Sequence, residues 1–341
     1  MNKILILDGG LGTSLEQTYN VKFSRDTPLW SSHLLVADQE TLLACQRDFG
    51  QVPVDIILTA TYQVSAGGFA ATRTSEHPRG ITEELTMARY IDDAVSIAER
   101  AKQPDSRVAL SIGPYGACMT PSQEYSGAYD ISSEQVDAWH RERMDLFARA
   151  VGNIQKRIAF VALETIPRAD EIRSMRRALA RPLGSVPFWM SCLFPGESDT
   201  LPDGTSVKDA VRAMLDPNDG PQPWGVGINC TKTRKLDRLL RRYESTVEAL
   251  VSEGVITSWP ALVLYPDGTN GEVYNTSTQQ WEMPDDGAPS EPRESWETQV
   301  SYAVRDTLDR GSWSQVVVGG CCMASYHDIG RLRLALSSLK L

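Results

Sequence analysis

Eight short runs of apolar residues recur along the 341-residue chain, and the stretches between them are long enough for a helix. Val, Ile and Leu fill successive positions of these runs, which is typical of parallel strands that helices cover. The runs are Ile4–Asp8, Asp55–Thr61, Val108–Tyr115, Phe160–Ile166, Pro187–Phe194, Gly225–Cys230, Ala261–Pro266 and Val316–Cys322. Eight strand–helix units in one chain of this size predict a (β/α)8 barrel, or TIM barrel.

The stretches between the runs show the spacing of amphipathic helices. Apolar residues recur every three or four positions in Ile81–Lys102, and Ser132–Val151 opens on a Ser-Ser-Glu start signal. The same pattern predicts helices over Asp170–Ala180, Thr233–Ser252 and Tyr326–Leu339. The alternative fold is an open doubly wound sheet, which usually carries a GxGxxG turn after its first strand. Asp8–Thr13 does not match that turn, so the barrel is favoured.

One segment interrupts the alternation of strands and helices. Asp267–Thr298 carries several acidic and proline residues with little apolar periodicity, so we expect a long loop after the seventh strand. Such a loop is either a surface insertion or a lid over the active-site face. We therefore predict a single barrel domain over residues 1–341, with an insertion at residues 267–298.

Composition narrows the range of partners. The chain is 41% hydrophobic and 23% charged with a net charge of −10, and it has no run rich in Lys or Arg, which argues against nucleic acid. Its apolar runs are too short to span a membrane or to form a signal peptide. We expect a cytoplasmic protein with reduced cysteines that is a monomer or a small homo-oligomer.

Polar residues gather where the predicted strands end. The first strand ends at Asp8, the second at Thr59 and Thr61, the fourth at Glu164, and the sixth at Asn229 and its neighbour. The carboxyl ends of the strands in a barrel meet on one face, where barrel enzymes keep their catalytic residues. The sequence therefore predicts an active site on this face.

Three of the six cysteines also lie at predicted strand ends. Cys230 ends the sixth strand, and the adjacent pair Cys321 and Cys322 ends the eighth. Three thiolates from two strands would bind zinc and leave its fourth position open, as in catalytic zinc sites. Neighbouring strand residues point to opposite faces, so we expect Gly319-Gly320 to bend the backbone and aim both sulfurs at one ion. The alternatives are inert buried thiols or a disulfide between the adjacent cysteines.

The residue types at the strand ends suggest the substrate. Zinc with three thiolates carries a net charge of −1, so it activates water poorly but can bind a substrate thiol and keep it deprotonated. The carboxylates of Asp8 and Glu164 suit an ammonium group, although either could instead cap a turn or helix. Thr59, Thr61 and the backbone amides of Gly9–Thr13 suit a carboxylate. Together these groups predict a thiol amino acid.

Six motifs run in order along nearly the whole chain and carry a family resemblance. They are Asp8-Gly9-Gly10-Leu11-Gly12-Thr13-Ser14-Leu15-Glu16, Thr59-Ala60-Thr61-Tyr62-Gln63, Gly113-Pro114-Tyr115-Gly116-Ala117, Glu164-Thr165-Ile166-Pro167, Gly227-Ile228-Asn229-Cys230 and Gly319-Gly320-Cys321-Cys322. In these motifs the chain resembles the homocysteine S-methyltransferase family. The resemblance implies a (β/α)8 barrel with Zn²⁺ on the three cysteines. It also implies that homocysteine is the methyl acceptor, with its amino group near Asp8 and Glu164, and that methionine is the product.

The chain departs from the family pattern at two places. Phe49–Asp55 replaces the usual Ala-Gly-Ala-Asp before the second strand, and the insertion after Tyr265-Pro266 is long for the family. The Thr-Tyr-Gln motif resembles the branch that uses S-methylmethionine or S-adenosylmethionine. We expect such a sulfonium donor to meet the aromatic rings of Trp30, Tyr62 and Tyr115, which otherwise serve only for packing.

Two other functions remain as alternatives. A zinc hydrolase would usually use His or carboxylate ligands and a positioned base, which the three-cysteine set does not supply. A zinc-binding or thiol-binding protein without catalytic activity would bind the same ligands but would not convert a substrate into a product.

Overall fold

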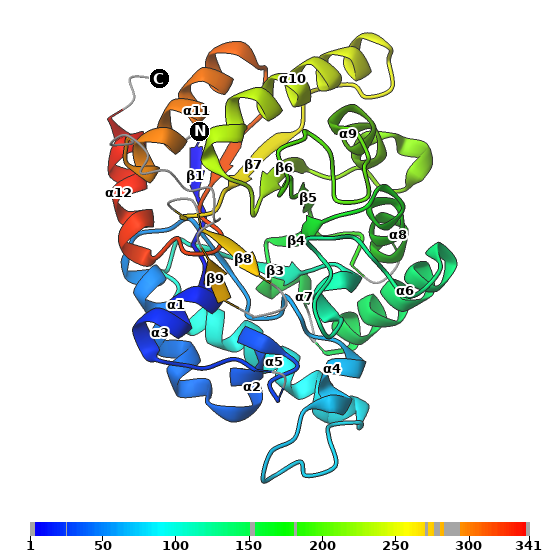
Figure 1. Cartoon of the computed structure of the whole chain (residues 1–341), viewed down its shortest axis with the longest axis vertical. Coiled ribbons are helices and arrows are strands. Elements are labelled where there is room, and N and C mark those ends of the chain that lie inside the picture. Colours follow the sequence, from blue (N-terminus) through cyan, green and yellow to red (C-terminus); the bar gives the residue numbers. More distant parts are fainter. Residues whose placement is uncertain are drawn as a thin grey trace.

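Eight parallel strands form the centre of the computed structural model, which describes residues 4–24, 26–150, 154–180, 183–269, 272–275, 280–282 and 294–338 (Figure 1). The strands are β1 (Ile4–Ile6), β2 (Ile56–Leu58), β3 (Arg107–Ile112), β4 (Phe160–Ile166), β5 (Phe188–Cys192), β6 (Gly225–Asn229), β7 (Ala261–Tyr265) and β10 (Val316–Val318). Their order in the sheet is β1-β10-β7-β6-β5-β4-β3-β2. A parallel bridge between Leu7 and Ile56 joins the two end strands. The predicted (β/α)8 barrel is therefore confirmed, with one strand in each predicted run.

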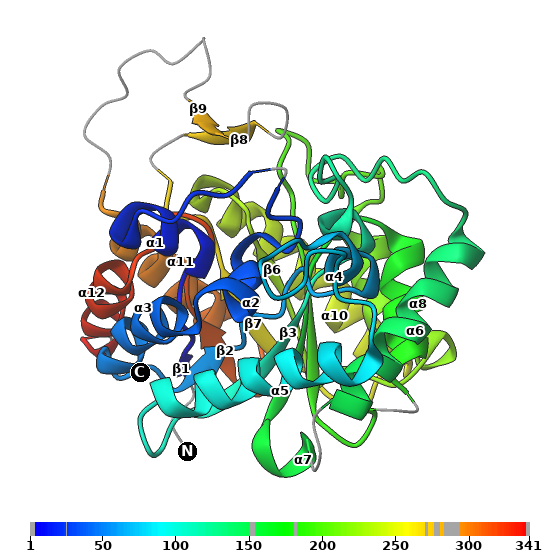
Figure 2. The same ribbon diagram turned by 90° about the horizontal axis from the view of Figure 1, so that it is seen from below.

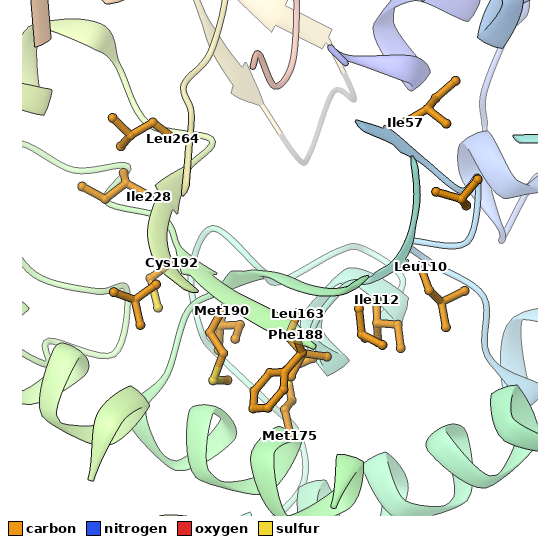
Figure 3. Close-up of a cluster of buried hydrophobic side chains, with 14 of the residues drawn as sticks. Ile57, Leu110, Ile112, Leu163, Met175, Phe188, Met190, Cys192, Ile228 and Leu264 are labelled. Atoms are coloured by element: carbon orange, nitrogen blue, oxygen red, sulfur yellow. The ribbon is translucent and has the colours of Figure 1, made fainter. Parts of the chain in front are cut away.

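Side chains alternate along each strand between the barrel interior and the ring of helices. On β4, Val161 and Leu163 point outward, whereas Phe160, Ala162 and Glu164 share the other face. Figure 3 shows the outward set on the neighbouring strands, where Ile57, Leu110, Met190, Cys192, Ile228 and Leu264 face the helices. This two-residue period places Glu164 above two apolar residues inside the barrel, at its mouth.

Helices follow the strands and form the outer layer. They are α1 (Leu11–Tyr19), α2 (Leu34–Ala37), α3 (Gln39–Gln51), α4 (Ala66–Ala71), α5 (Glu84–Ala101), α6 (Ser133–Ala150), α7 (Ile154–Arg157), α8 (Ala169–Leu179), α9 (Val207–Leu215), α10 (Leu236–Ser252), α11 (Trp296–Arg310) and α12 (Tyr326–Ser337). The five helices predicted from spacing correspond to α5, α6, α8, α10 and α12. Side-chain caps begin some of the others: Asp38 caps α3, and Ser206 caps α9. No helix among the described residues is long and apolar enough to cross a membrane.

Two buried cations fix loops at the carboxyl-terminal face of the barrel. Arg143 on α6 donates hydrogen bonds to the carbonyl oxygens of Tyr62 at 2.7 Å, Val64 at 2.7 Å and Gly113 at 2.5 Å. Lys235 donates to three carbonyl oxygens in the loop after β5. Buried charges are tolerated when hydrogen bonds satisfy them, so these two residues hold the loops around the mouth in place.

The segment after β7 contains regular structure where we expected a long loop. Its described residues include an antiparallel hairpin of β8 (Val273–Asn275) and β9 (Gln280–Glu282). Other parts of the predicted insertion lie outside the described residues, namely 270–271, 276–279 and 283–293. The hairpin stands beyond the carboxyl-terminal ends of the barrel strands (Figures 1 and 2). The segment also ends earlier than residue 298, because α11 begins at Trp296. The Trp296 indole donates to the Asp267 carbonyl oxygen at 2.9 Å, so both ends of the segment are packed on the barrel.

Candidate active site

A cavity opens at the carboxyl-terminal ends of the strands, on the face that the sequence indicated. The loops after β1, β2, β3, β4, β6 and β10 all contribute to its wall. Eleven of the fourteen residues predicted for the site line it: Asp8, Gly9, Gly10, Thr13, Trp30, Thr59, Tyr62, Glu164, Cys230, Cys321 and Cys322. Thr61, Asn229 and Tyr115 are outside the lining.

The three cysteines of the predicted zinc site line this cavity, and the carboxylate of Asp267, which is outside the lining, lies beside them. Single ligand atoms from Cys230, Cys321, Cys322 and Asp267 all lie within 4.8 Å of one another. The sulfur atoms of Cys230 and Cys321 are 2.50 Å apart and are paired as a disulfide in this structure. Cys192 points away from the barrel interior, so it is not part of this group (Figure 3). Three sulfurs and one oxygen at such spacing form a donor set for a thiophilic metal ion.

An unusual backbone conformation brings these side chains together. Thr165 near the end of β4, Cys230 after β6 and Met323 after the cysteine pair have φ values of 60°, 44° and 65°. Residues other than glycine rarely adopt the left-handed backbone conformation, and those that do cluster at functional sites. The carboxyl ends of these strands are thus held in a conformation that packing alone would not favour.

The two glycines before the cysteine pair serve a different purpose from the one predicted. Neither Gly319 nor Gly320 has a positive φ, so they do not supply an unusual bend. A Cβ atom on Gly319 would lie 2.6 Å from the Asp8 carbonyl oxygen, and one on Gly320 would lie 2.2 Å from the Ala324 Cβ. Glycine is needed because β10 passes close to the end of β1 and to the following turn.

Asn229 supports the thiols rather than lining the cavity. Its Oδ1 accepts a hydrogen bond from the Thr165 backbone N–H at 3.0 Å. Its Nδ2 donates to the Thr165 hydroxyl at 2.7 Å and to the Cys230 sulfur at 3.3 Å. The residue therefore ties the end of β4 to the end of β6 and orients Cys230.

Asp267 is a site residue that sequence reasoning assigned to the insertion. Burial raises the pKa of its carboxyl group to about 7, against the opposing effect of Lys232. Its Oδ1 is buried and has no hydrogen-bond partner among the described residues. A buried oxygen without a partner costs free energy, so this atom is placed for a ligand rather than for stability.

Two further carboxyl groups, those of Asp8 and Glu164, line the cavity. Burial raises the pKa of Asp8 to about 8. The Leu58 backbone N–H donates to Asp8 Oδ2 at 2.8 Å and lowers this pKa, whereas the charge of Glu164 raises it further. Burial likewise raises the pKa of Glu164 to about 7, although the Ser111 hydroxyl donates to its Oε1. Asp8 Oδ1 is unpartnered in the described part of the chain. A cation between these groups would lower both pKa values by stabilising the ionised forms.

Donors for an anion come from the start of α1. Gly10, Leu11, Gly12 and Thr13 line the cavity, and the first backbone N–H groups of a helix lack partners within it. The close packing of this turn explains Gly10, because a Cβ atom there would lie 2.4 Å from the Cys321 carbonyl oxygen. A ligand carboxylate therefore has donors beside the thiol cluster.

The threonines of β2 are less available than predicted. The Thr59 hydroxyl lies 2.6 Å from that of Thr61 and accepts a hydrogen bond from the Ser111 N–H at 3.0 Å. Thr61 is fully buried and donates to the Ser111 carbonyl oxygen at 2.7 Å. The pair joins the ends of β2 and β3, and the helix start remains the better partner for a carboxylate.

Of the three predicted aromatic residues, two reach the cavity. Trp30 packs against Phe23 with ring centroids 5.4 Å apart, and the Tyr62 hydroxyl hydrogen-bonds Thr165. Tyr115 turns away: its hydroxyl donates to Asp130 at 2.7 Å, and its ring packs against neighbouring aromatic rings outside the lining.

The loop after β3 brings two unpredicted residues, Glu124 and Tyr125, to the cavity. Tyr125 takes the place expected of Tyr115, because it lines the cavity and lowers the pKa of the Cys322 thiol against the larger effect of burial. Neither residue carried a usable signal in the sequence, since both lie well past the end of their strand. Asp267 did carry one, because it directly follows the end of the seventh strand.

Comparison with known proteins agrees with this geometry. The family model for homocysteine S-methyltransferase matches residues 5–336 of the chain. The chain is 30% identical to the homocysteine S-methyltransferase of Escherichia coli, over 97% of this chain and 94% of that protein. It is 29% identical to the homocysteine S-methyltransferase YbgG of Bacillus subtilis, over 99% and 96% of the two chains. It is also similar to a selenocysteine Se-methyltransferase of Brassica oleracea, with 28% identity over 98% and 89%.

Solved structures show the same likeness. The metallated form of the homocysteine methyltransferase MmuM from Escherichia coli superposes with a TM-score of 0.68 and 26% identity, over 98% of this chain and 96% of that one. The oxidized form of MmuM gives a TM-score of 0.67 at the same identity and coverage.

Proposed function

Because the chain belongs to the homocysteine S-methyltransferase family, we propose that its methyl transfer to homocysteine uses a zinc ion and a sulfonium methyl donor. The observation that carries this proposal is the meeting of three thiols and one carboxylate within 4.8 Å of one another at the cavity wall that the three cysteines form. Thiolates favour zinc over harder divalent cations, and the buried, unpartnered Oδ1 of Asp267 suits a positive charge. The relative MmuM also exists in a metallated form.

Cys230, Cys321 and Cys322 would hold the ion, which requires Cys230 and Cys321 to be reduced, and Asp267 faces it from the end of β7. A zinc ion bound there would keep the homocysteine sulfur deprotonated at neutral pH. A free thiol has a pKa of about 8.5 and is mostly protonated under those conditions. The acceptor therefore needs a site that binds its thiolate form.

The rest of the acceptor fits the groups beside the cysteines. Asp8 and Glu164 bind the ammonium group, which supplies the buried carboxylates with the cation they lack. The backbone N–H groups at the start of α1 bind the carboxylate. Holding both ends of the amino acid leaves its side-chain sulfur at the thiol cluster, in a fixed position for attack.

The reaction is a displacement at the methyl carbon. A lone pair of the acceptor sulfur forms the new S–C bond while the bond from that carbon to the sulfonium sulfur breaks. The electron pair of the broken bond stays on the donor, which leaves as a neutral thioether. No proton is needed by the leaving group, so the reaction requires no general acid.

The aromatic and acidic mouth favours a cationic donor. Trp30 and Tyr62 line the cavity, and aromatic faces attract cations. We rank S-methylmethionine above S-adenosylmethionine, and both above betaine.

The decisive experiment measures zinc and turnover in the same reduced sample. We expect one zinc per chain and methionine formation from homocysteine with a sulfonium donor. Cys230→Ala should lose both, whereas Cys45→Ala, which removes a buried thiol of α3 outside the cavity, should keep both. Stoichiometric zinc and normal turnover in Cys230→Ala would refute the metal site, and preferential use of betaine would refute the donor class.

A further inference from the structure

The cavity extends beyond the thiol cluster to a third buried carboxyl group. Glu124 lies in the loop after β3, lines the cavity and is only 7% exposed. Its Oε2 is buried and has no hydrogen-bond partner among the described residues. The Ser122 hydroxyl and the backbone N–H of Glu124 lower the pKa of the carboxyl group, against the larger effect of burial. The Oε2 atom of Glu124 is therefore available to accept a hydrogen bond from a ligand.

Glu124 belongs to a different part of the cavity from the acceptor carboxylates. The charge of Glu164 acts on Asp8, which places these two together at the ends of β1 and β4. Glu124 comes from the loop after β3, and it raises the pKa values of Tyr125 and Cys322, whereas both Glu124 and Glu164 raise that of Tyr62. The cavity therefore has acids from two places in the barrel, a pair at the ends of β1 and β4 and one in the loop after β3.

Nothing in the cavity wall neutralises Glu124. Its described lining includes the acids Asp8, Glu16, Glu124 and Glu164 but no Lys, Arg or His side chain. Burial raises the pKa of Glu124 to about 7, since its ionised form lacks a cationic partner. A ligand that brings a positive charge to this position restores the ionised form and completes the missing hydrogen bond.

The loop that carries Glu124 is held rigidly. The Gln123 N–H donates to the Gly116 carbonyl oxygen at 2.8 Å, and Arg168 donates to the Gly127 carbonyl oxygen at 3.1 Å. Gly116 has no room for a side chain, because a Cβ atom there would lie 2.9 Å from the Glu124 nitrogen. The carboxyl group is therefore positioned before any ligand arrives, which reduces the entropy cost of binding.

We propose that Glu124 binds the α-ammonium group of the methyl donor, so that the site selects sulfonium amino acids over sulfonium compounds without an amino group. The inference rests on the proposed function and adds the donor's recognition group to it. Two amino acids then bind in one cavity, the acceptor through Asp8 and Glu164 and the donor through Glu124. S-methylmethionine and S-adenosylmethionine share this ammonium group, whereas the nitrogen of betaine is quaternary and has no N–H to donate.

The test compares two donors that differ only in the amino group. S-methylmethionine and 4-dimethylsulfoniobutanoate have the same sulfonium centre and carboxylate, but only the first carries an ammonium. Dissociation constants for both, and kcat/KM with homocysteine, are measured for the reduced zinc enzyme, Glu124→Gln and Glu134→Gln. Glu134 lies on the exposed surface of α6, so its variant is the matched control.

We expect Glu124→Gln to weaken S-methylmethionine binding by about ten- to hundredfold, the effect of losing one charge-assisted hydrogen bond. Binding of 4-dimethylsulfoniobutanoate, the homocysteine KM and the zinc content should stay within about twofold of the parent enzyme. Glu134→Gln should match the parent in every measurement. The preference for the amino-bearing donor thus disappears in Glu124→Gln alone.

Two results would overturn the inference while leaving the proposed function intact. One is unchanged S-methylmethionine binding in Glu124→Gln, and the other is an equal loss for both donors. A parent enzyme that binds neither sulfonium compound would instead refute the donor class itself. Thermal unfolding of both variants checks that their folds are retained.

Discussion

The lower part of the barrel interior and its mouth lie on the same strands but meet different demands. On β4, Phe160 packs below the mouth against Trp189 and Trp224, with ring centroids 5.5 Å and 4.7 Å apart. Four residues later on the same face, Glu164 is a buried acid with a raised pKa. Burial of apolar surface in the lower region stabilises the folded protein, whereas buried charge and left-handed backbone at the mouth destabilise it. Substitutions should therefore separate stability from function along a single strand.

The largest expected effect is the loss of function in Cys322→Ala. This cysteine contributes a sulfur to the cluster but is only half-buried. We expect zinc content and turnover to fall to background, while the free energy of unfolding of the metal-free protein changes by less than about 1 kcal/mol. Metal analysis and urea unfolding measure the two quantities. A large loss of stability in the metal-free protein would show that the mouth contributes to the fold as the lower interior does.

The opposite result is expected for Phe160→Ala. Removing a buried phenyl ring should lower the free energy of unfolding by about 3–5 kcal/mol. The protein that remains folded should bind zinc and homocysteine normally, because no cavity residue is changed. Leu334→Ala, at a position 72% exposed, is the control and should shift stability by less than about 0.5 kcal/mol. If Phe160→Ala loses zinc while still folded, the two regions are coupled.

Glu164→Gln tests the other end of the same strand. Losing a charge-assisted hydrogen bond to the acceptor's ammonium should cost about 1.5–3 kcal/mol, seen as a higher homocysteine KM. Zinc content should remain normal, since Glu164 is not among the metal-binding side chains. An unchanged KM in both Glu164→Gln and Asp8→Asn would mean that these acids do not bind the acceptor.

The pH dependence of stability offers a milder test of the mouth. Asp8 has a pKa raised from 3.8 to about 8, and that of Glu164 is raised from 4.5 to about 7. Between these values the unfolded chain loses protons that the folded protein keeps, so stability falls as pH rises from about 4 to 8. Urea unfolding of the metal-free protein without substrate should show this slope. Asp8→Asn should reduce the slope and leave the part that Glu164, Glu124 and Asp267 contribute, and Phe160→Ala should leave it unchanged.

The same contrast explains what could be predicted from the sequence. Strands and amphipathic helices follow from hydrophobic periodicity, which reflects burial and is local. All eight strands and five of the helices were therefore found. The helices that were missed are α1, α2, α3, α4, α7, α9 and α11; most are short, and α11 begins inside the segment that was predicted as a loop. The meeting of Cys230, Cys321 and Cys322 could be predicted because all three thiols lie at strand ends, and their binding of zinc stays a prediction.

Side-chain direction in loops was not predictable in this way. Tyr115 lies three residues after the end of β3, yet it packs outward, while Tyr125 returns to the cavity ten residues later. Asp267 was grouped with the acidic residues after it, although it lies next to the thiols. Such positions depend on tertiary hydrogen bonds such as that from Trp296 to Asp267, which leave no local pattern.

The two tyrosines give the smallest and most selective test of this distinction. Tyr125→Phe removes the hydroxyl that lowers the pKa of the Cys322 thiol, and we expect the zinc affinity of the proposed site to fall by about tenfold. Tyr115→Phe removes a hydroxyl that bonds Asp130 outside the cavity, so zinc affinity should not change. Competition with a zinc chelator measures both affinities under the same conditions. A weaker affinity in Tyr115→Phe than in Tyr125→Phe would reverse the assignment, because it would place the functional tyrosine at the strand end and not in the loop.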